Sequence, residues 1–245
     1  MGAALLAVYA ISDVARGYLA ENGNAAAVAP AILTELATGG LGVAWSDPLA
    51  PIPSTRTIAR RVAEGAGMGV AAAAIAAAVI VAARIAPARA GAPGLDLIAA
   101  LIAPVFLAVR HELLAHGLLF RAMRASPTWA KLAAGSLASG AWTFGHGAWL
   151  GETVVSVAGG FATSYLWIRD RGAWRAMAAH GAWAFMVATV LRGGVVDVGP
   201  ASGHLGGLDG GVGVSLIGAL VIAAVAIVGI WRDRGRPRAL SDAAG

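Results

Sequence analysis

Long runs of apolar residues, separated by short polar segments, dominate the chain. Six of them approach or exceed the roughly 18 residues that a helix needs to cross a bilayer. These runs cover residues 66–86, 97–120, 130–149, 153–169, 174–192 and 212–231. The pattern predicts an all-α protein, a polytopic bundle of transmembrane helices.

Two weaker candidates for spans precede these six. Residues 3–20 are apolar but carry Asp13 and Arg16, and residues 26–45 carry Glu35. Three prolines between positions 48 and 53 then interrupt any helix. The chain is therefore predicted to have six to eight spans.

The same pattern predicts three regions. Residues 1–65 are expected to hold membrane-associated helices and a Pro-rich linker that ends in a basic cluster. Residues 66–231 form the expected transmembrane core, and residues 232–245 form a basic tail.

Composition and charge support a membrane protein. Only 13% of the residues are charged, whereas soluble domains have about 25%. Most lysines and arginines fall in alternate inter-span segments, which predicts a cytoplasmic C-terminus by the positive-inside rule. The net charge of +5 is thus explained by membrane orientation, and no basic soluble module that would bind nucleic acid is predicted. The chain has no cysteine, which excludes disulfides and thiolate chemistry.

Titratable residues inside the predicted spans are the strongest functional signal. Such side chains are costly in lipid and usually face the bundle interior or a wet cavity. Here they comprise four of the five histidines and one glutamate: His111, Glu112, His116, His146 and His180. We predict that they gather around a common pocket. Arg110 lies in the same run but is given no role.

Helical geometry separates these residues further. Glu112 and His116 are four apart and share a helix face, so the carboxylate is expected to hold the imidazole. His111 is rotated by about 100° from Glu112, toward a neighbouring helix. The zinc motif with two histidines at i and i+4 is not met, because the second histidine is at i+5.

Three short segments resemble the motifs of the CPBP (CAAX protease and bacteriocin-processing, or Abi) family of intramembrane endopeptidases. Residues 111–116 are similar to the family's Glu-Glu-x-x-x-Arg, with His111 and His116 in place of the first Glu and the Arg. Residues 142–146 are similar to Phe-x-x-x-His, with Trp142 for Phe. Residues 180–184 resemble His-x-x-x-Asn/Asp, with Ala184 in the last position. The resemblance covers about residues 97–192.

This resemblance implies hydrolysis of a peptide bond in or near the membrane, with a hydrophobic or membrane-anchored peptide as substrate and membrane lipid as surroundings. It also implies an integral protein of a bacterial-type plasma membrane. In the family the first Glu activates water while the histidines and Asn act on the carbonyl. Because that Glu is replaced here, four alternatives remain open. In the first two alternatives Glu112 or His111 is the base. In the third, a Zn²⁺ ion binds to His111, His146 and His180, and in the fourth, catalysis is lost.

Three other classes of protein compete with this hypothesis. A rhomboid-like serine protease would use Ser139 as nucleophile and His180 as base, but Ser139 is more simply explained as a small residue in helix packing. A transporter would need paired broken helices, which the pattern does not contain. The main rival is a non-catalytic scaffold, immunity protein or chaperone that binds a hydrophobic peptide in the same cavity.

Overall fold

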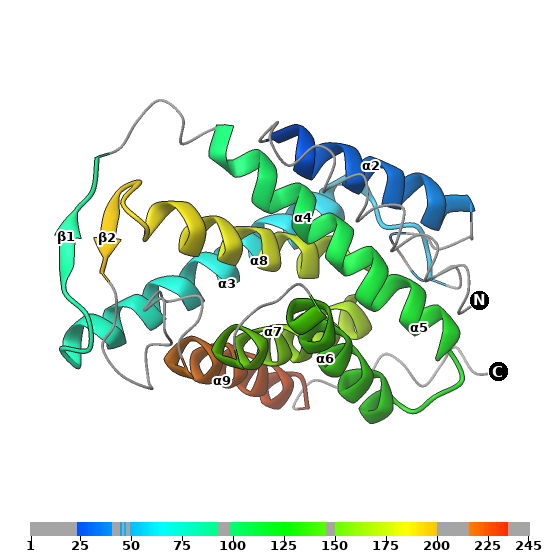
Figure 1. Cartoon of the computed structure of the whole chain (residues 1–245). Helices are drawn as coiled ribbons and strands as arrows, with labels where there is room; N and C mark the ends of the chain where they lie inside the picture. The colour runs from blue at the N-terminus through cyan, green and yellow to red at the C-terminus, as the bar shows by residue number, and fades with distance from the viewer. Residues whose placement is uncertain are drawn as a thin grey trace.

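The computed structural model describes residues 24–40, 45, 47, 50–92, 99–145, 150–199 and 216–234. They form a helical bundle with one short two-stranded sheet at its side (Figure 1). The elements are α2 (Asn24–Gly40), α3 (Thr55–Ala82), β1 (Ala88–Ala90), α4 (Ile102–Glu112), α5 (Leu119–Ala122), α6 (Thr128–Gly145), α7 (Leu150–Asp170), α8 (Trp174–Phe185), β2 (Val196–Val198) and α9 (Leu216–Arg234). The predicted all-α class is confirmed.

Within the described residues, three helices are long and apolar enough to cross a membrane. These candidates are Thr55–Ala82, Ile102–Ala122 and Leu216–Asp233. The other predicted spans are also helical, as α6, α7 and α8, but they do not meet the same criteria of length and composition. The count of six to eight crossings therefore stays a prediction. The upstream candidate at residues 3–20 lies outside the described residues.

The start of α3 differs from the sequence-based expectation. Residues 55–65 were expected to be part of a linker, but they form the first turns of α3. The side chain of Ser54 accepts a hydrogen bond from the backbone N–H of Thr57 and so caps the helix. The basic residues Arg56 and Arg60 are exposed on these turns, so their charges do not interrupt the helix.

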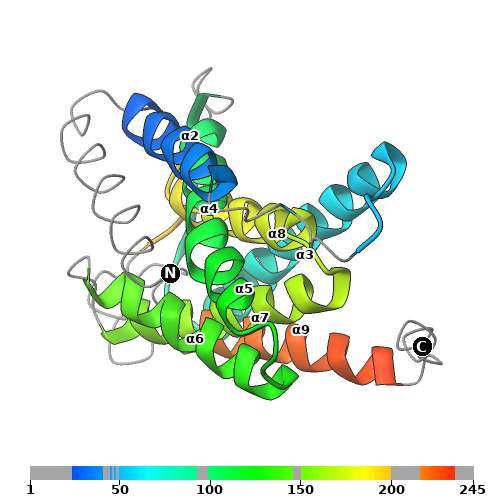
Figure 2. The ribbon, with the colours of Figure 1, turned by 90° about the vertical axis from the view of Figure 1, so that its right-hand side faces the viewer.

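Glycines of α3 allow it to pack closely against α8, as Figures 1 and 2 both show. A Cβ atom added to Gly69 would lie 2.9 Å from the backbone nitrogen of Trp183, and one added to Gly65 would meet the carbonyl oxygen of Arg175. The spacing of four residues is the small-xxx-small pattern that brings membrane helices together. This contact holds α8 and therefore positions His180.

The short sheet links the segments that follow α3 and α8. Residues 88–90 of β1 pair antiparallel with residues 196–198 of β2, with Arg89 opposite Asp197. These strands lie at the end of the bundle away from α5 (Figure 1).

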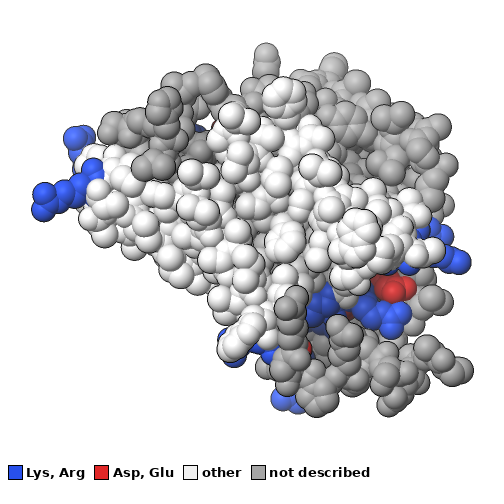
Figure 3. Space-filling view, turned by 90° about the horizontal axis from the view of Figure 1, so that it is seen from below, with Lys and Arg blue, Asp and Glu red and all other residues white. Residues whose placement is uncertain are grey.

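Charged residues gather at the ends of the helices, while the face in between is apolar. Figure 3 shows a broad surface without charged side chains, with basic residues at its two sides. Exposed apolar side chains on α9 include Leu220, Ile227 and Val228. Such a surface suits contact with lipid.

An ion cluster ties α3, α7 and α8 together at one of these ends. The guanidinium of Arg175 lies 2.5 Å from Glu64 Oε2 and 3.1 Å from Asp170 Oδ2, and Arg61 is 3.6 Å from the same Asp170 oxygen. Burial raises the pKa of the Asp170 carboxyl above its ordinary value, although Arg175 and Arg61 act in the opposite direction. The carboxylate therefore depends on these cations to remain ionised.

Replacing Arg175 with alanine is expected to destabilise the fold by about 3–5 kcal/mol, because it leaves the buried Asp170 without its main partner. Thermal unfolding in detergent measures this change. Arg60→Ala is the matched control, because the Arg60 side chain is 68% exposed in its 3.8 Å pair with Glu64, and such surface pairs contribute little. Equal losses in both variants would contradict the structural role of the cluster.

Candidate active site

The continuous helix that begins with α4 and ends with α5 carries three of the predicted site residues. Its helix type changes between them. It runs as an α-helix to Glu112, as a π-helix over Leu113–Leu118 and again as an α-helix in α5. Short π-helical segments are frequent at functional sites because they redirect side chains within a helix. His116 lies in this segment and is fully buried.

Glu112 lies between two histidines. Its Oε1 atom accepts a hydrogen bond from Nδ1 of His180, 2.9 Å away, and its Oε2 atom lies 2.8 Å from Nδ1 of His116. The glutamate is 0% exposed, so these imidazoles are its polar partners in place of water: His180 by a hydrogen bond, and His116 by a close contact without hydrogen-bond geometry. The predicted contact between Glu112 and His116 is present.

His111 completes the group on the other side of His180. The Nδ1 atoms of His111 and His180 are 3.3 Å apart, and their rings meet edge to face with centroids 4.8 Å apart. Nδ1 of His111 also lies 3.8 Å from Glu112 Oε1. We call His111, Glu112 and His180 the His/Glu cluster. Each of its members offers one ligand atom, all within 4.8 Å of one another, so the cluster could hold a metal ion.

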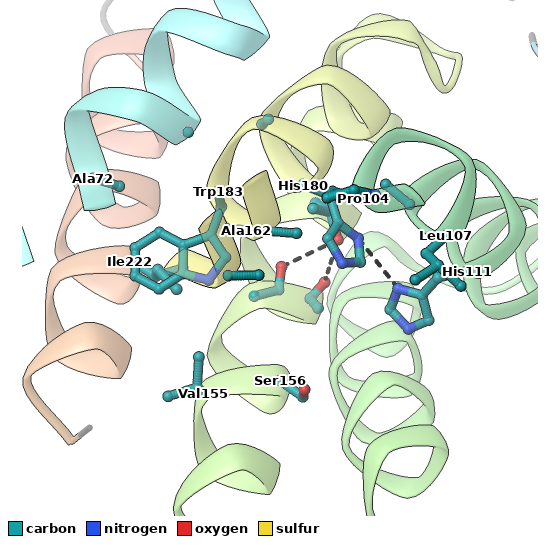
Figure 4. Close-up of a pocket in the computed structure, with 18 of the residues that line it drawn as sticks. Ala72, Pro104, Leu107, His111, Val155, Ser156, Ala162, His180, Trp183 and Ile222 are labelled. Carbon is teal, nitrogen blue, oxygen red and sulfur yellow. Dashed lines mark hydrogen bonds between the residues drawn. The ribbon is translucent and has the colours of Figure 1, made fainter. Parts of the chain in front are cut away.

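The cluster borders a cavity of about 980 Å³ with a mainly apolar lining. The lining residues come from six helices and include Met68, Pro104, Trp142, Val155, Trp183 and Ile222. His111 and His180 belong to this lining and face each other in Figure 4. Glu112 and His116 are not in the lining and are fully buried, whereas the imidazoles of His111 and His180 are half-buried at the cavity wall. The cavity can therefore offer an apolar ligand access to two histidines that a buried carboxylate orients.

His116 is held on its far side by α7. Its Nε2 atom is 3.4 Å from the carbonyl oxygen of Gly160 and 3.5 Å from Oγ1 of Thr163. The imidazole stacks beside Trp167, with ring centroids 6.4 Å apart. His116 thus links the orientation of Glu112 to the position of α7.

The remaining sequence predictions have different outcomes. His146 lies outside the described residues, so its predicted place beside His180 and its role as a metal ligand stay predictions. Ala184 lines the cavity, which makes the wall apolar where the family motif has a polar residue. Ser139 is fully buried in α6, close to Gly160 of α7, and does not line the cavity.

Two charged residues of the cavity were missed or left without a role by the sequence analysis. Glu152 lines the cavity from the first turn of α7. It precedes the predicted span 153–169 by one residue and was therefore not counted among the intramembrane groups. Arg110 also lines the cavity, is 2% exposed and lies 4.9 Å above the ring of Trp142. In the sequence, the position of Arg110 in an apolar run next to His111 was the signal that could have indicated a place in the cavity.

Replacing Ser139 with alanine is expected to leave any hydrolytic activity within about twofold of wild type, because the hydroxyl is used in packing between α6 and α7 and does not reach the cavity. Peptide cleavage rates of the two purified proteins test this expectation. Abolished activity in a folded Ser139→Ala variant would instead support the serine-protease hypothesis.

Residues 93–186 match the protein-family model described as type II CAAX prenyl endopeptidase Rce1-like. The segment is Rce1-like. The matched segment contains the His/Glu cluster. The match confirms the resemblance to CAAX-type intramembrane proteases that the motifs predicted. The Rce1-like segment and the three candidate spans together indicate an integral membrane protein. No curated protein and no solved structure matches the chain.

Proposed function

We propose that the protein is an intramembrane endopeptidase that hydrolyses a peptide bond of a membrane-associated substrate in the cavity beside the His/Glu cluster. The observation that carries this proposal is the meeting of His111, Glu112 and His180 from two helices at the wall of an apolar cavity. The Rce1-like segment supports the same reaction class.

The arrangement supplies what water activation requires. Glu112 accepts a hydrogen bond from Nδ1 of His180, which leaves the other ring nitrogen of this cavity-lining residue free to take a proton from water. The water oxygen then bonds to the carbonyl carbon, the bond from carbon to the amide nitrogen breaks, and the proton passes to the departing amine. His111 lies beside His180 and takes part in positioning the water, and His146 is retained as a further candidate for contact with the carbonyl.

The substrate we propose is a peptide carried by a hydrophobic segment or a lipid anchor. The cavity has apolar walls formed in part by Trp183, Val155 and Ile222, which would accommodate such a group. The matching family model is described as a CAAX prenyl endopeptidase, so a prenyl chain is one anchor to test. We further propose a bacterial-type plasma membrane as the location, with the C-terminus in the cytoplasm.

The proposal is tested with purified full-length protein in liposomes and quenched fluorescent peptides. Three peptides of identical sequence carry a farnesyl group, a palmitoyl group or no lipid. Wild type is expected to cleave at least one lipidated peptide, and Glu112→Gln is expected to cleave it at least about 100-fold more slowly because the neutral amide no longer supports His180 as a base.

Ser139→Ala serves as the folded control in this assay. Binding of a lipidated peptide without cleavage, equal in wild type and in Glu112→Gln, would contradict the proposal. That result would favour the non-catalytic scaffold that binds a hydrophobic peptide.

A further inference from the structure

We infer that Trp183 limits the length of the hydrocarbon chain that the cavity accepts, and that the chain of a lipidated substrate runs from His180 along α8 to this indole. This role of Trp183 deepens the proposed function and rests on it for the identity of the substrate. Binding of the chain can be measured without cleavage.

The lining of the cavity differs between its two sides. The titratable side chains of Arg110, His111 and His180 come from α4 and α8. The residues that α3 and α9 contribute to the described lining have no polar side chain: Met68, Gly69, Ala72, Ile222 and Val225. Figure 4 shows Ala72 and Ile222 on the opposite side of the cavity from His111. A peptide bond is therefore best accommodated beside the imidazoles, and a hydrocarbon chain between α3 and α9.

The indole of Trp183 lies on this apolar side. It lines the cavity and packs against a buried cluster that consists of Val155, Ala219 and Ile222. In Figure 4 the ring extends from α8 toward Ile222 and away from the imidazole of His111. Tryptophan has the largest side chain of all residues, so its ring determines how much of this space is left for a chain.

The position of Trp183 on α8 relates the chain to the reacting bond. His180 and Trp183 are three residues apart, so they share a face of α8 and lie about 4.5 Å apart along its axis. A chain attached close to a scissile bond at His180 can therefore follow this face to the indole. A Cβ atom added to Gly69 would lie 2.9 Å from the backbone nitrogen of Trp183, so α3 fixes this turn of α8. The indole is thus anchored to a part of the helix that cannot easily move aside.

The cavity has room for a peptide segment together with a chain. Its volume of about 980 Å³ is at the upper end of the range of roughly 300–1,000 Å³ that ligand cavities have. The outer face of α9 exposes Leu220, Ile227 and Val228, so this helix separates the apolar side of the cavity from the surrounding lipid. A phospholipid chain has the same chemistry, but only a substrate places a peptide bond at the imidazoles, and we therefore assign the space to the substrate's chain.

The test measures binding of lipidated peptides to full-length protein in nanodiscs. It uses the Glu112→Gln background, in which cleavage is slow. The peptides share one sequence and carry saturated acyl chains that lengthen by two carbons at a time from octanoyl to stearoyl. Each buried methylene group is worth about fourfold in affinity, so affinity should rise with chain length until the chain reaches the indole, and then stop rising.

Trp183→Ala is expected to move this limit to longer chains, because the space of the indole becomes available. For a chain two carbons longer than the limit set by Trp183, the alanine variant should bind about 15-fold more tightly. Trp183→Phe should have an intermediate limit. With Glu112 intact, kcat/KM for peptide cleavage should shift with chain length in the same order, which a residue that only stabilises the fold would not cause.

Ala162→Leu tests the same path in the opposite direction. Ala162 of α7 is half-buried in the lining and lies between Trp183 and His180 in Figure 4. A leucine at this position should shorten the longest chain that still gains affinity, and it keeps the test decisive if Trp183→Ala does not fold. Trp129→Ala is the matched control, because Trp129 is 72% exposed and does not line the cavity, so its removal should leave the limit unchanged.

An unchanged limit in folded Trp183→Ala and Ala162→Leu overturns the inferred role, and so does an affinity that does not depend on chain length. Labelling of the cavity by a photoactivatable phospholipid that lipidated peptides do not displace would assign the space to a bilayer lipid and also overturn it. Cleavage at a rate independent of chain length contradicts only the role of Trp183 and leaves the peptidase intact. The expected shifts in binding, without cleavage of any peptide, support this role and contradict the peptidase.

Discussion

Peptide cleavage is expected to fall by about 10²–10⁴-fold when either His180 is replaced by alanine or Glu112 by glutamine, the range that loss of acid–base catalysis produces. The two residues share a 2.9 Å hydrogen bond and act as one unit. The double variant should therefore be about as active as the worse of the two single variants, because groups that act as a unit give strongly non-additive losses. Measurements of kcat/KM for the four proteins test this expectation.

The control for this experiment is the fold of each variant, measured by thermal unfolding in detergent. His180 is partly exposed to the cavity, so its truncation leaves no large buried void. If the losses of the single variants multiply in the double variant, Glu112 and His180 act independently and the paired mechanism is wrong.

Replacing Gly160 with leucine is expected to destabilise the bundle by about 3 kcal/mol or more, above the usual range for overpacking. A Cβ atom added here would already lie 2.5 Å from Ser139 Oγ and 2.9 Å from the carbonyl oxygen of Gly135. Because these groups belong to α6, the two helices must separate to admit the side chain. A displacement of α7 would also disturb the contact between its Gly160 carbonyl and His116, so cleavage should fall together with the unfolding temperature.

The smaller change Gly160→Ala tests the same contact, and Gly159→Ala is its matched control. The residue is a neighbour in the same helix, and a Cβ atom added to it meets nothing within 4 Å. Alanine favours the helix by about 1 kcal/mol relative to glycine, so this variant should be as stable as wild type or slightly more stable. If Gly160→Ala proved equally harmless, the close contact between α6 and α7 would not be needed for stability.

The polar residues of the second predicted span could be singled out because their signal is local. A charged or titratable group within an apolar run stands out in the sequence, and the spacing of four between Glu112 and His116 is enough to predict their contact. This contact was predicted from the period of an α-helix, and it is retained although the chain passes into a π-helix after Glu112.

The partners across helices were less predictable. The rotation of His111 away from Glu112 indicated a neighbouring helix but not its identity, and the structure shows that His180 of α8 contacts both residues. The structure places Glu112 beside His111 and His180, whereas the ligand set expected from the sequence joined these two histidines to His146, which lies outside the described residues. Glu152 was missed since the boundary of a span, drawn from hydropathy, does not show where a cavity begins.

The sequence alone therefore determined the helical class, the placement of scarce ionisable groups in apolar runs and the contacts within one helix. These follow from composition and from the fixed period of the helix. Only the tertiary structure decided that His111 and His180 line the cavity while Glu112 is fully buried, and that α3 and α7 hold the helices that carry them. The reason is that the rotation and depth of one helix against another depend on close contacts at a few small residues, and these contacts form only when the helices pack.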